Sequence, residues 1–234
     1  MSGRPNIVLV HGAWADGSCW SAVIERLQAQ DFQVTAPQFA LGPLADDVTR
    51  LRDVLRRQTG PTIVVGHSYG GQIMTALGDD APNVAGLVYV AAHAPNVGED
   101  EGALGKKTPS FLAKQTDAVE KTADGYTYLN PAVFPKDFAA DLPLRQATFE
   151  SRSQILTSAQ VFTTPLTAAA WTSKPSWGIV AGSDKIINPD LERWYYERAH
   201  SHITVIPGAS HSVYESKPQQ VAAVIEDAAK HAVQ

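Results

Sequence analysis

The segment Val64–Ile73 reads VVGHSYGGQI, an apolar run that ends at a glycine and is followed by one serine and two further glycines. The apolar residues are typical of a buried strand, and a helical pattern follows from Gly70. Gly66–Gly70 matches G-x-S-x-G, in which the serine occupies a strained turn between a strand and a helix. A turn that only links the two elements would also use small residues, but the context favours Ser68 as a nucleophile.

A serine hydroxyl needs a base that takes its proton and a carboxylate that orients the base. His211 lies in PGASHSVYESKP, between a predicted strand at Ile203–Ile206 and the last predicted helix. Asp184 follows another predicted strand, Ser176–Ala181, in SWGIVAGSDKIINP. Because the ends of parallel strands meet at one edge of a sheet, we expect Asp184 and His211 to lie near Ser68.

Other histidines and carboxylates fit these roles less well. His67 is inside the turn, where its ring should point away, and His93 follows a strand and is expected to line a pocket. Asp190 and Glu192 begin a predicted helix, where carboxylates are explained by capping and by the helix dipole.

Short strand patterns alternate with helical patterns along the chain. The predicted strands are Asn6–Val10, Phe32–Ala36, Thr62–Val65, Ala85–Ala91, Ser176–Ala181 and Ile203–Ile206, and the helical patterns cover about 20–27, 44–55, 70–78, 191–199 and 221–229. Strands that alternate with helices are typical of βαβ units. The sequence therefore predicts an α/β fold with a mostly parallel sheet flanked by helices.

The segment 95–172 interrupts this alternation. No clear strand pattern occurs in it, and aromatic residues are scattered among prolines and short helical patches. Long connections of this kind often form lids over sites. We expect a small, mainly helical cap, inserted into a core made of residues 1–94 and 173–234.

Composition limits the classes of partner. The chain has 234 residues, 44% hydrophobic and 18% charged, with a net charge of −5, which gives no reason to expect nucleic acid. No apolar stretch approaches the ~20 residues that span a bilayer, and the apolar run at the N-terminus is too short for a secretory signal. We expect a cytoplasmic protein that acts on small molecules. Cys19 is the only cysteine, which excludes an internal disulfide and a cysteine metal cluster, and the oligomeric state stays open.

The order Ser68, Asp184, His211 resembles the α/β-hydrolase superfamily over nearly the whole chain. The resemblance implies a sheet with its site at the carboxyl ends of the strands, here in a shortened form of about six strands because few residues precede Asn6. Within the superfamily, HGAWADGSCW at His11–Trp20 resembles the HGA…W opening of small bacterial esterases and of plant salicylate esterases and hydroxynitrile lyases.

The same resemblance implies an oxyanion hole formed by the backbone amides of Ala13 and Tyr69. Two amides that point at a developing negative charge need no side-chain chemistry. His11 is then a support for its loop. We expect Trp14 to form a wall of the substrate pocket, together with His93, and Trp20 to lie in the core.

These residues imply a serine hydrolase that cleaves carboxylic esters, lactones included, through an acyl-enzyme and without metal or cofactor. Two alternatives remain: a cofactor-free perhydrolase or dioxygenase on the same fold, and a small-molecule receptor that has lost turnover. The related hydroxynitrile lyases carry a threonine after the first histidine and a lysine after the catalytic one. Gly12 and Ser212 stand at these positions, which favours hydrolysis over cyanohydrin cleavage.

Overall fold

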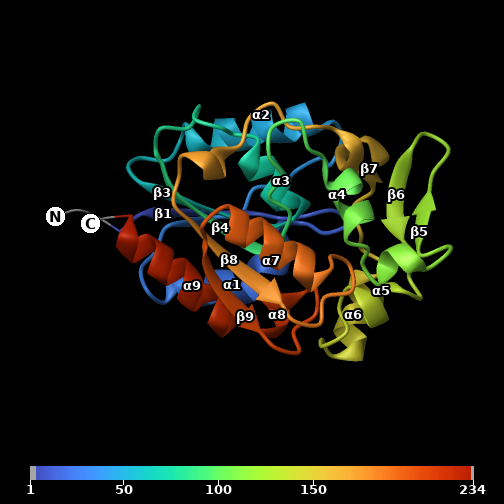
Figure 1. The fold of residues 1–234 in the computed structure, drawn as a ribbon. Coiled ribbons are helices and arrows are strands. Elements are labelled where there is room, and N and C mark those ends of the chain that lie inside the picture. Colours follow the sequence, from blue (N-terminus) through green and yellow to red (C-terminus); the bar gives the residue numbers. More distant parts are fainter. Residues whose placement is uncertain (1–3, 233–234) are drawn as a thin grey trace.

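Six parallel strands form the central sheet of the computed structural model, which describes residues 4–232 (Figure 1). The strand order is β2-β1-β3-β4-β8-β9. The strands are β1 (Asn6–Val10), β2 (Val34–Thr35), β3 (Thr62–Ser68), β4 (Val84–Ala92), β8 (Ser176–Ala181) and β9 (His202–Ile206). This arrangement confirms the predicted fold class, a mostly parallel sheet of about six strands flanked by helices.

Helices cover both faces of the sheet. The short 3₁₀ helix η1 (Gly17–Trp20), α1 (Ser21–Gln28), α8 (Val213–Ser216) and α9 (Pro218–His231) pack on one face, and α2 (Leu44–Leu55), α3 (Tyr69–Thr75) and α7 (Pro189–Arg198) pack on the other. Along β1, Ile7 and Leu9 pack against the face that α1 and α9 cover, and Val8 and Val10 pack against the face that α2, α3 and α7 cover. Burial on both faces explains why the strands are apolar throughout rather than alternating.

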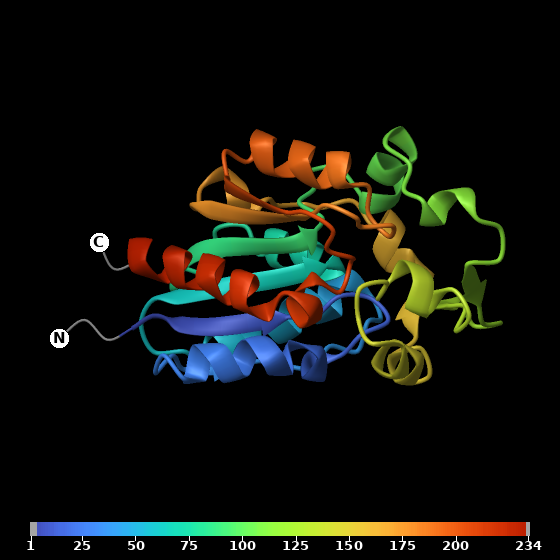
Figure 2. The ribbon, with the colours of Figure 1, turned by 90° about the horizontal axis from the view of Figure 1, so that it is seen from below.

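The insertion between β4 and β8 lies beyond the carboxyl ends of the strands, where the arrowheads point in Figure 2. Its helices are α4 (Glu101–Lys107), α5 (Phe134–Asp137) and α6 (Leu144–Glu150), with 3₁₀ turns η2 (Leu112–Lys114), η3 (Ala159–Thr163) and η4 (Ala170–Thr172). It also contains a three-stranded antiparallel sheet of β5 (Val119–Lys121), β6 (Tyr126–Leu129) and β7 (Thr157–Ser158). The expectation of a mainly helical cap missed these strands, because each is very short and β7 lies far from β6 in the sequence.

Hydrogen bonds fasten this cap to two loops of the core. The carbonyl oxygen of Phe138 accepts from the Ser212 amide at 3.0 Å and from the hydroxyl groups of Ser212 and Ser210 at 3.2 and 3.3 Å. On the β1 side, the Trp14 indole N–H donates to Thr127 Oγ1 at 3.1 Å and the Trp14 amide donates to Thr157 Oγ1 at 3.0 Å. The cap is therefore held over the loops that follow β1 and β9.

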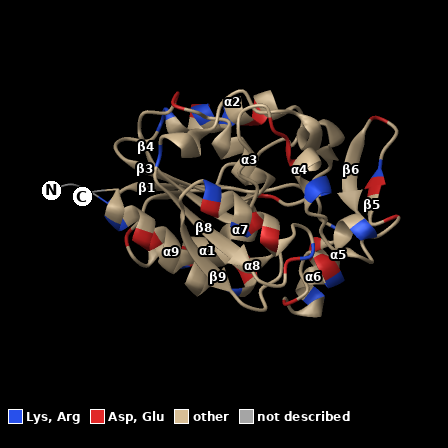
Figure 3. Ribbon diagram, in the orientation of Figure 1, with Lys and Arg blue, Asp and Glu red and all other residues tan. Residues whose placement is uncertain are grey.

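Charged side chains of both signs occur along the outer helices, as on α2, α7 and α9 in Figure 3. Such interspersed charges are typical of a solvated surface. No helix in the described part of the chain is long and apolar enough to cross a membrane.

Gly70 lets α3 pass close to β1. A Cβ atom at this position would lie 2.4 Å from the carbonyl oxygen of Val10, which is backbone and cannot move aside easily. We expect Gly70→Ala to lower the free energy of unfolding by about 1–3 kcal/mol, as overpacking does. The matched control is Gly105→Ala in α4, where nothing lies within 4 Å of the new methyl group and the free energy should rise by about 0.5–1 kcal/mol. Urea denaturation measures both, and equal effects at the two positions would contradict this account of the packing.

Candidate active site

Ser68 is the last residue of β3, and α3 begins at the next residue. Its backbone has φ 54° and ψ −123°, a conformation that costs about 1–3 kcal/mol for a residue with a side chain. The turn closes because Gly66 has no side chain: a Cβ there would lie 2.7 Å from the carbonyl oxygen of Gly70. The strained turn holds Ser68 at the wall of a cavity, as a nucleophile elbow does.

His211 and Asp184 come together beyond the ends of β9 and β8. The Nδ1 atom of His211 lies 2.6 Å from Oδ2 of Asp184, and both side chains are fully buried. Oδ1 of Asp184 accepts from the amides of Ile186 and Ile187 at 2.7 and 3.0 Å, which fixes the carboxylate. The structure thus forms the predicted histidine–carboxylate pair.

The other ring nitrogen of His211, Nε2, is buried and has no hydrogen-bond partner among the described residues. It is the atom that would accept a proton from a serine hydroxyl. Ser68 and His211 share no hydrogen bond in the structure. In free enzymes such hydrogen bonds are often long and tighten only when substrate binds.

His67 supports the loop that carries His211 and does not line the cavity. Its Nε2–H donates to the carbonyl oxygen of His211 at 2.8 Å, and the two ring centroids lie 4.5 Å apart. Burial lowers the pKa of His67 well below its usual value, and the nearby His211 lowers it further. A neutral His67 is therefore a packing and hydrogen-bonding partner of His211.

The amides proposed for the oxyanion hole belong to the residue after Ser68 and to the loop after β1. Tyr69 is the first residue of α3, where the N–H has no acceptor within the helix. Ala13 follows β1 and lines the cavity, and its amide donates to no acceptor in the described part of the chain. The Tyr69 side chain points toward α2, because its hydroxyl donates to Asp47 Oδ2 at 3.0 Å.

His11 has a structural role in the loop after β1. Its Nδ1–H donates to the carbonyl oxygen of Gly12 and its Nε2 accepts from the Phe39 amide, both at 3.0 Å. Burial lowers the pKa of His11, so the neutral ring keeps one donor and one acceptor. This agrees with the expectation that His11 supports its loop.

The cavity beside Ser68 has a volume of about 670 Å³, which is within the range of sites for small organic ligands. The end of β3 and the segments that follow β1 and β4 contribute Ala13, Trp14, Ser68 and His93 to its wall, and the segment 186–191 contributes further core residues. The cap covers it with residues that include Leu112 and Phe162. Trp14 and His93 therefore lie where the sequence predicted pocket walls. Trp20 is fully buried in the core, as expected.

Sequence reasoning missed a second histidine–carboxylate pair in this wall. His93 Nε2 lies 2.7 Å from Glu101 Oε2, and Nδ1 of the same ring lies 3.2 Å from the Tyr195 hydroxyl. Glu101 begins α4 of the cap and is 5% exposed. No pattern in the sequence identifies it, because its position depends on how the cap folds over β4.

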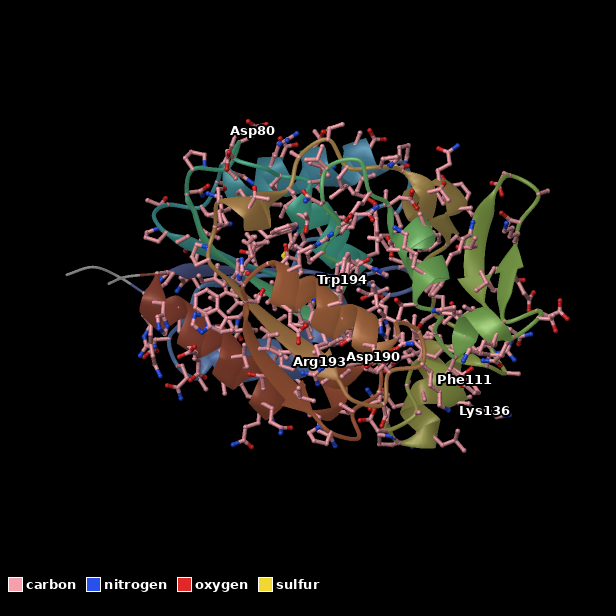
Figure 4. The ribbon with its side chains drawn as sticks, viewed as in Figure 1. Asp80, Phe111, Lys136, Asp190, Arg193 and Trp194 are labelled. Atoms are coloured by element: carbon pink, nitrogen blue, oxygen red, sulfur yellow. The ribbon has the colours of Figure 1, made fainter. Side chains whose placement is uncertain are left out.

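Glu192 lies in the first turn of α7, as the sequence predicted, but the structure gives it a contact beyond the helix start. Asn188 is the N-cap of α7, and its side chain accepts from the Asp190 amide at 3.0 Å. Asp190, Arg193 and Trp194 lie on the exposed face of this helix (Figure 4). Glu192 lies on the opposite face, fully buried, and its Oε2 accepts from the Ala181 amide at 2.9 Å.

Comparisons with known proteins agree with this architecture. The sequence profile described as the Alpha/beta hydrolase family matches residues 7–224. Among curated proteins, a pyrethroid hydrolase of Sphingobium wenxiniae is 26% identical over 95% of this chain and 86% of its own length. The rice (Oryza sativa subsp. japonica) esterase PIR7B is 24% identical over 96% of this chain and 95% of its own length.

Solved structures have the same fold. The crystal structure of polyneuridine aldehyde esterase superimposes with a TM-score of 0.82 at 16% identity, and the match covers 96% of this chain and 99% of the other. At this identity the likeness establishes the fold alone.

Proposed function

Because the chain belongs to the alpha/beta hydrolase family, we propose that it cleaves carboxylic esters of small molecules, lactones included, through an acyl-enzyme on Ser68. The observation that carries this proposal is the 2.6 Å pair of His211 and Asp184, formed at the same sheet edge as the strained Ser68 turn. Similarity to hydrolases and esterases supports the reaction class. The pyrethroid hydrolase among these relatives supports small-molecule esters as the substrate class.

In the proposed reaction, Ser68 Oγ attacks the ester carbonyl while His211 Nε2 takes the hydroxyl proton. The carbonyl oxygen becomes an oxyanion that accepts from the amides of Ala13 and Tyr69. His211 then gives its proton to the leaving alcohol, and the acyl group stays on Ser68. Water, deprotonated by His211, attacks the acyl-enzyme, and His211 returns this proton to Ser68 Oγ as the bond to the acyl group breaks and the acid leaves. Asp184 stabilises the imidazolium in both halves.

A fluorophosphonate probe tests this proposal directly, because it reacts with activated serines. We expect stoichiometric labelling of the folded protein, located at Ser68 by peptide mass spectrometry. Hydrolysis of a series of aryl and alkyl esters and lactones would then define the substrate range. A folded protein that neither reacts with the probe nor hydrolyses any ester would favour the receptor alternative.

We expect hydrolysis of a short aryl ester and negligible release of cyanide from mandelonitrile. A lyase must stabilise departing cyanide, and a cation beside the base would do so. The position after His211 holds Ser212, a buried side chain whose hydroxyl donates to the Phe138 carbonyl oxygen. A threonine at Gly12 would not fit, since its Cβ would lie 2.8 Å from Ser68 Cβ and from the His67 carbonyl oxygen.

Purified protein assayed on both substrates decides between the two reactions. Efficient cyanide release without ester hydrolysis would overturn the assignment as an esterase. Hydrolysis of the ester with only background cyanide release would support it.

A further inference from the structure

A second buried carboxyl group lies behind Asp184. Glu192 is on the inner face of α7 and is 0% exposed. One residue, Ala181 at the end of β8, holds both acids: its amide donates to Glu192 Oε2 at 2.9 Å, and its carbonyl oxygen accepts from the Asp184 amide at 3.1 Å. Besides burial, the charge of Asp184 and a side-chain hydrogen bond to it raise the pKa of Glu192, so the two carboxyl groups lie close together.

Two ionised carboxylates are both acceptors, so a hydrogen bond between these two groups requires a proton on one of them. Asp184 already accepts hydrogen bonds from Ile186, Ile187 and His211, so three donors point at its two oxygens. Glu192 accepts from a single donor at Oε2, and its Oε1 is buried with no hydrogen-bond partner among the described residues. Burial raises the pKa of Glu192 well above its usual value, and the negative charge of Asp184 raises it further. The proton therefore belongs on Glu192.

We propose that Glu192 is a positioning residue of the active site, whose neutral carboxylic acid donates a hydrogen bond to Asp184 and holds that carboxylate against His211. This inference rests on the proposed function, in which Asp184 orients the base. A neutral donor stabilises the negative charge of Asp184 without cancelling it. A lysine or arginine there would instead compete with the His211 imidazolium for the same carboxylate.

The contrast between glutamine and methionine at position 192 tests the proposal. In Glu192→Gln the amide oxygen accepts from Ala181 and the amide N–H donates to Asp184, so we expect most of the wild-type kcat/KM for a short aryl ester. Glu192→Met has similar volume and no donor. We expect kcat to fall about tenfold to a hundredfold, as for loss of a hydrogen bond to a charged group, with little change in KM.

A double-mutant cycle shows whether Glu192 acts through Asp184. In the Asp184→Asn background, Glu192→Met should lower kcat much less than it does in the wild type, because the carboxylate that it positions is gone. Full additivity would overturn the proposal. So would a Glu192→Gln variant as impaired as Glu192→Met, or a Glu192→Met variant as active as the wild type.

Infrared spectroscopy tests the proton itself and needs no activity. At neutral pH the wild type should show a protonated-carboxyl C=O band that disappears in Glu192→Gln. The matched control is Glu215→Gln: burial and the adjacent Glu150 raise the pKa of Glu215 to about 9, so its loss should remove a different band. An unchanged band in Glu192→Gln would overturn the proposal even if Glu192→Met does not fold. Failure of Ser68 labelling would refute the esterase instead and leave the infrared result standing.

Discussion

Replacing Ser68 with alanine is expected to lower kcat/KM for ester hydrolysis by about 10⁶. The hydroxyl oxygen is the only protein atom that forms a covalent bond with the substrate in the proposed mechanism, and alanine removes it. The fold should stay cooperative, because the new methyl group occupies the place of the serine Cβ and the φ of 54° strains both residues alike. Initial rates on a short aryl ester, together with urea unfolding, measure both effects.

Ser110→Ala is the matched control, since Ser110 lines the same cavity and its hydroxyl oxygen accepts from the Ala113 amide at 3.1 Å. This variant should keep most of the activity and should still react with the fluorophosphonate probe. Wild-type turnover by Ser68→Ala would show that the nucleophile lies elsewhere.

Asp184→Asn is expected to lower kcat/KM by about 10⁴. The amides of Ile186 and Ile187 both donate to Oδ1, so the asparagine oxygen should take that place and turn the NH₂ group toward His211 Nδ1. An N–H donor there selects the tautomer that carries its proton on Nε2. That tautomer cannot accept the proton of Ser68.

The loss should be smaller than in Ser68→Ala, because a nucleophile and the oxyanion amides remain. Asp190→Asn, on the exposed face of α7, is the control and should change kcat/KM little. If Asp184→Asn turned over substrate at the wild-type rate, the orienting role would belong to another group.

The central sheet could be predicted from the sequence because its strands are buried on both faces. Asn6–Val10 and Ser176–Ala181 were predicted with the bounds that the structure has, since each apolar run ends at a loop. The prediction of Phe32–Ala36 was too long. Only Val34–Thr35 forms ladder bonds, because β2 is an edge strand and pairs on one side with β1.

The cap and two carboxylates could not be predicted in the same way. Tyr126–Leu129 becomes a strand by pairing with Val119–Lys121 on one side and with Thr157–Ser158 on the other, and the preference of so short a segment depends on its partners. Glu192 and Glu101 resemble surface carboxylates in the sequence. In the folded chain both are buried, Glu192 against the Ala181 amide and Glu101 against His93. The predicted roles of Ser68, His211 and Asp184 stay predictions until the variants are measured.

The whole cap lies between β4 and β8, which are hydrogen-bonded neighbours in the sheet. The entropy lost in closing such a connection rises only with the logarithm of its length, so doubling it costs about 0.6 kcal/mol. We therefore expect the strand pairing of the core to tolerate changes in the length of this segment. Evolution can alter the size and shape of the substrate cavity through the cap while the strand ends keep Ser68, Asp184 and His211 in register.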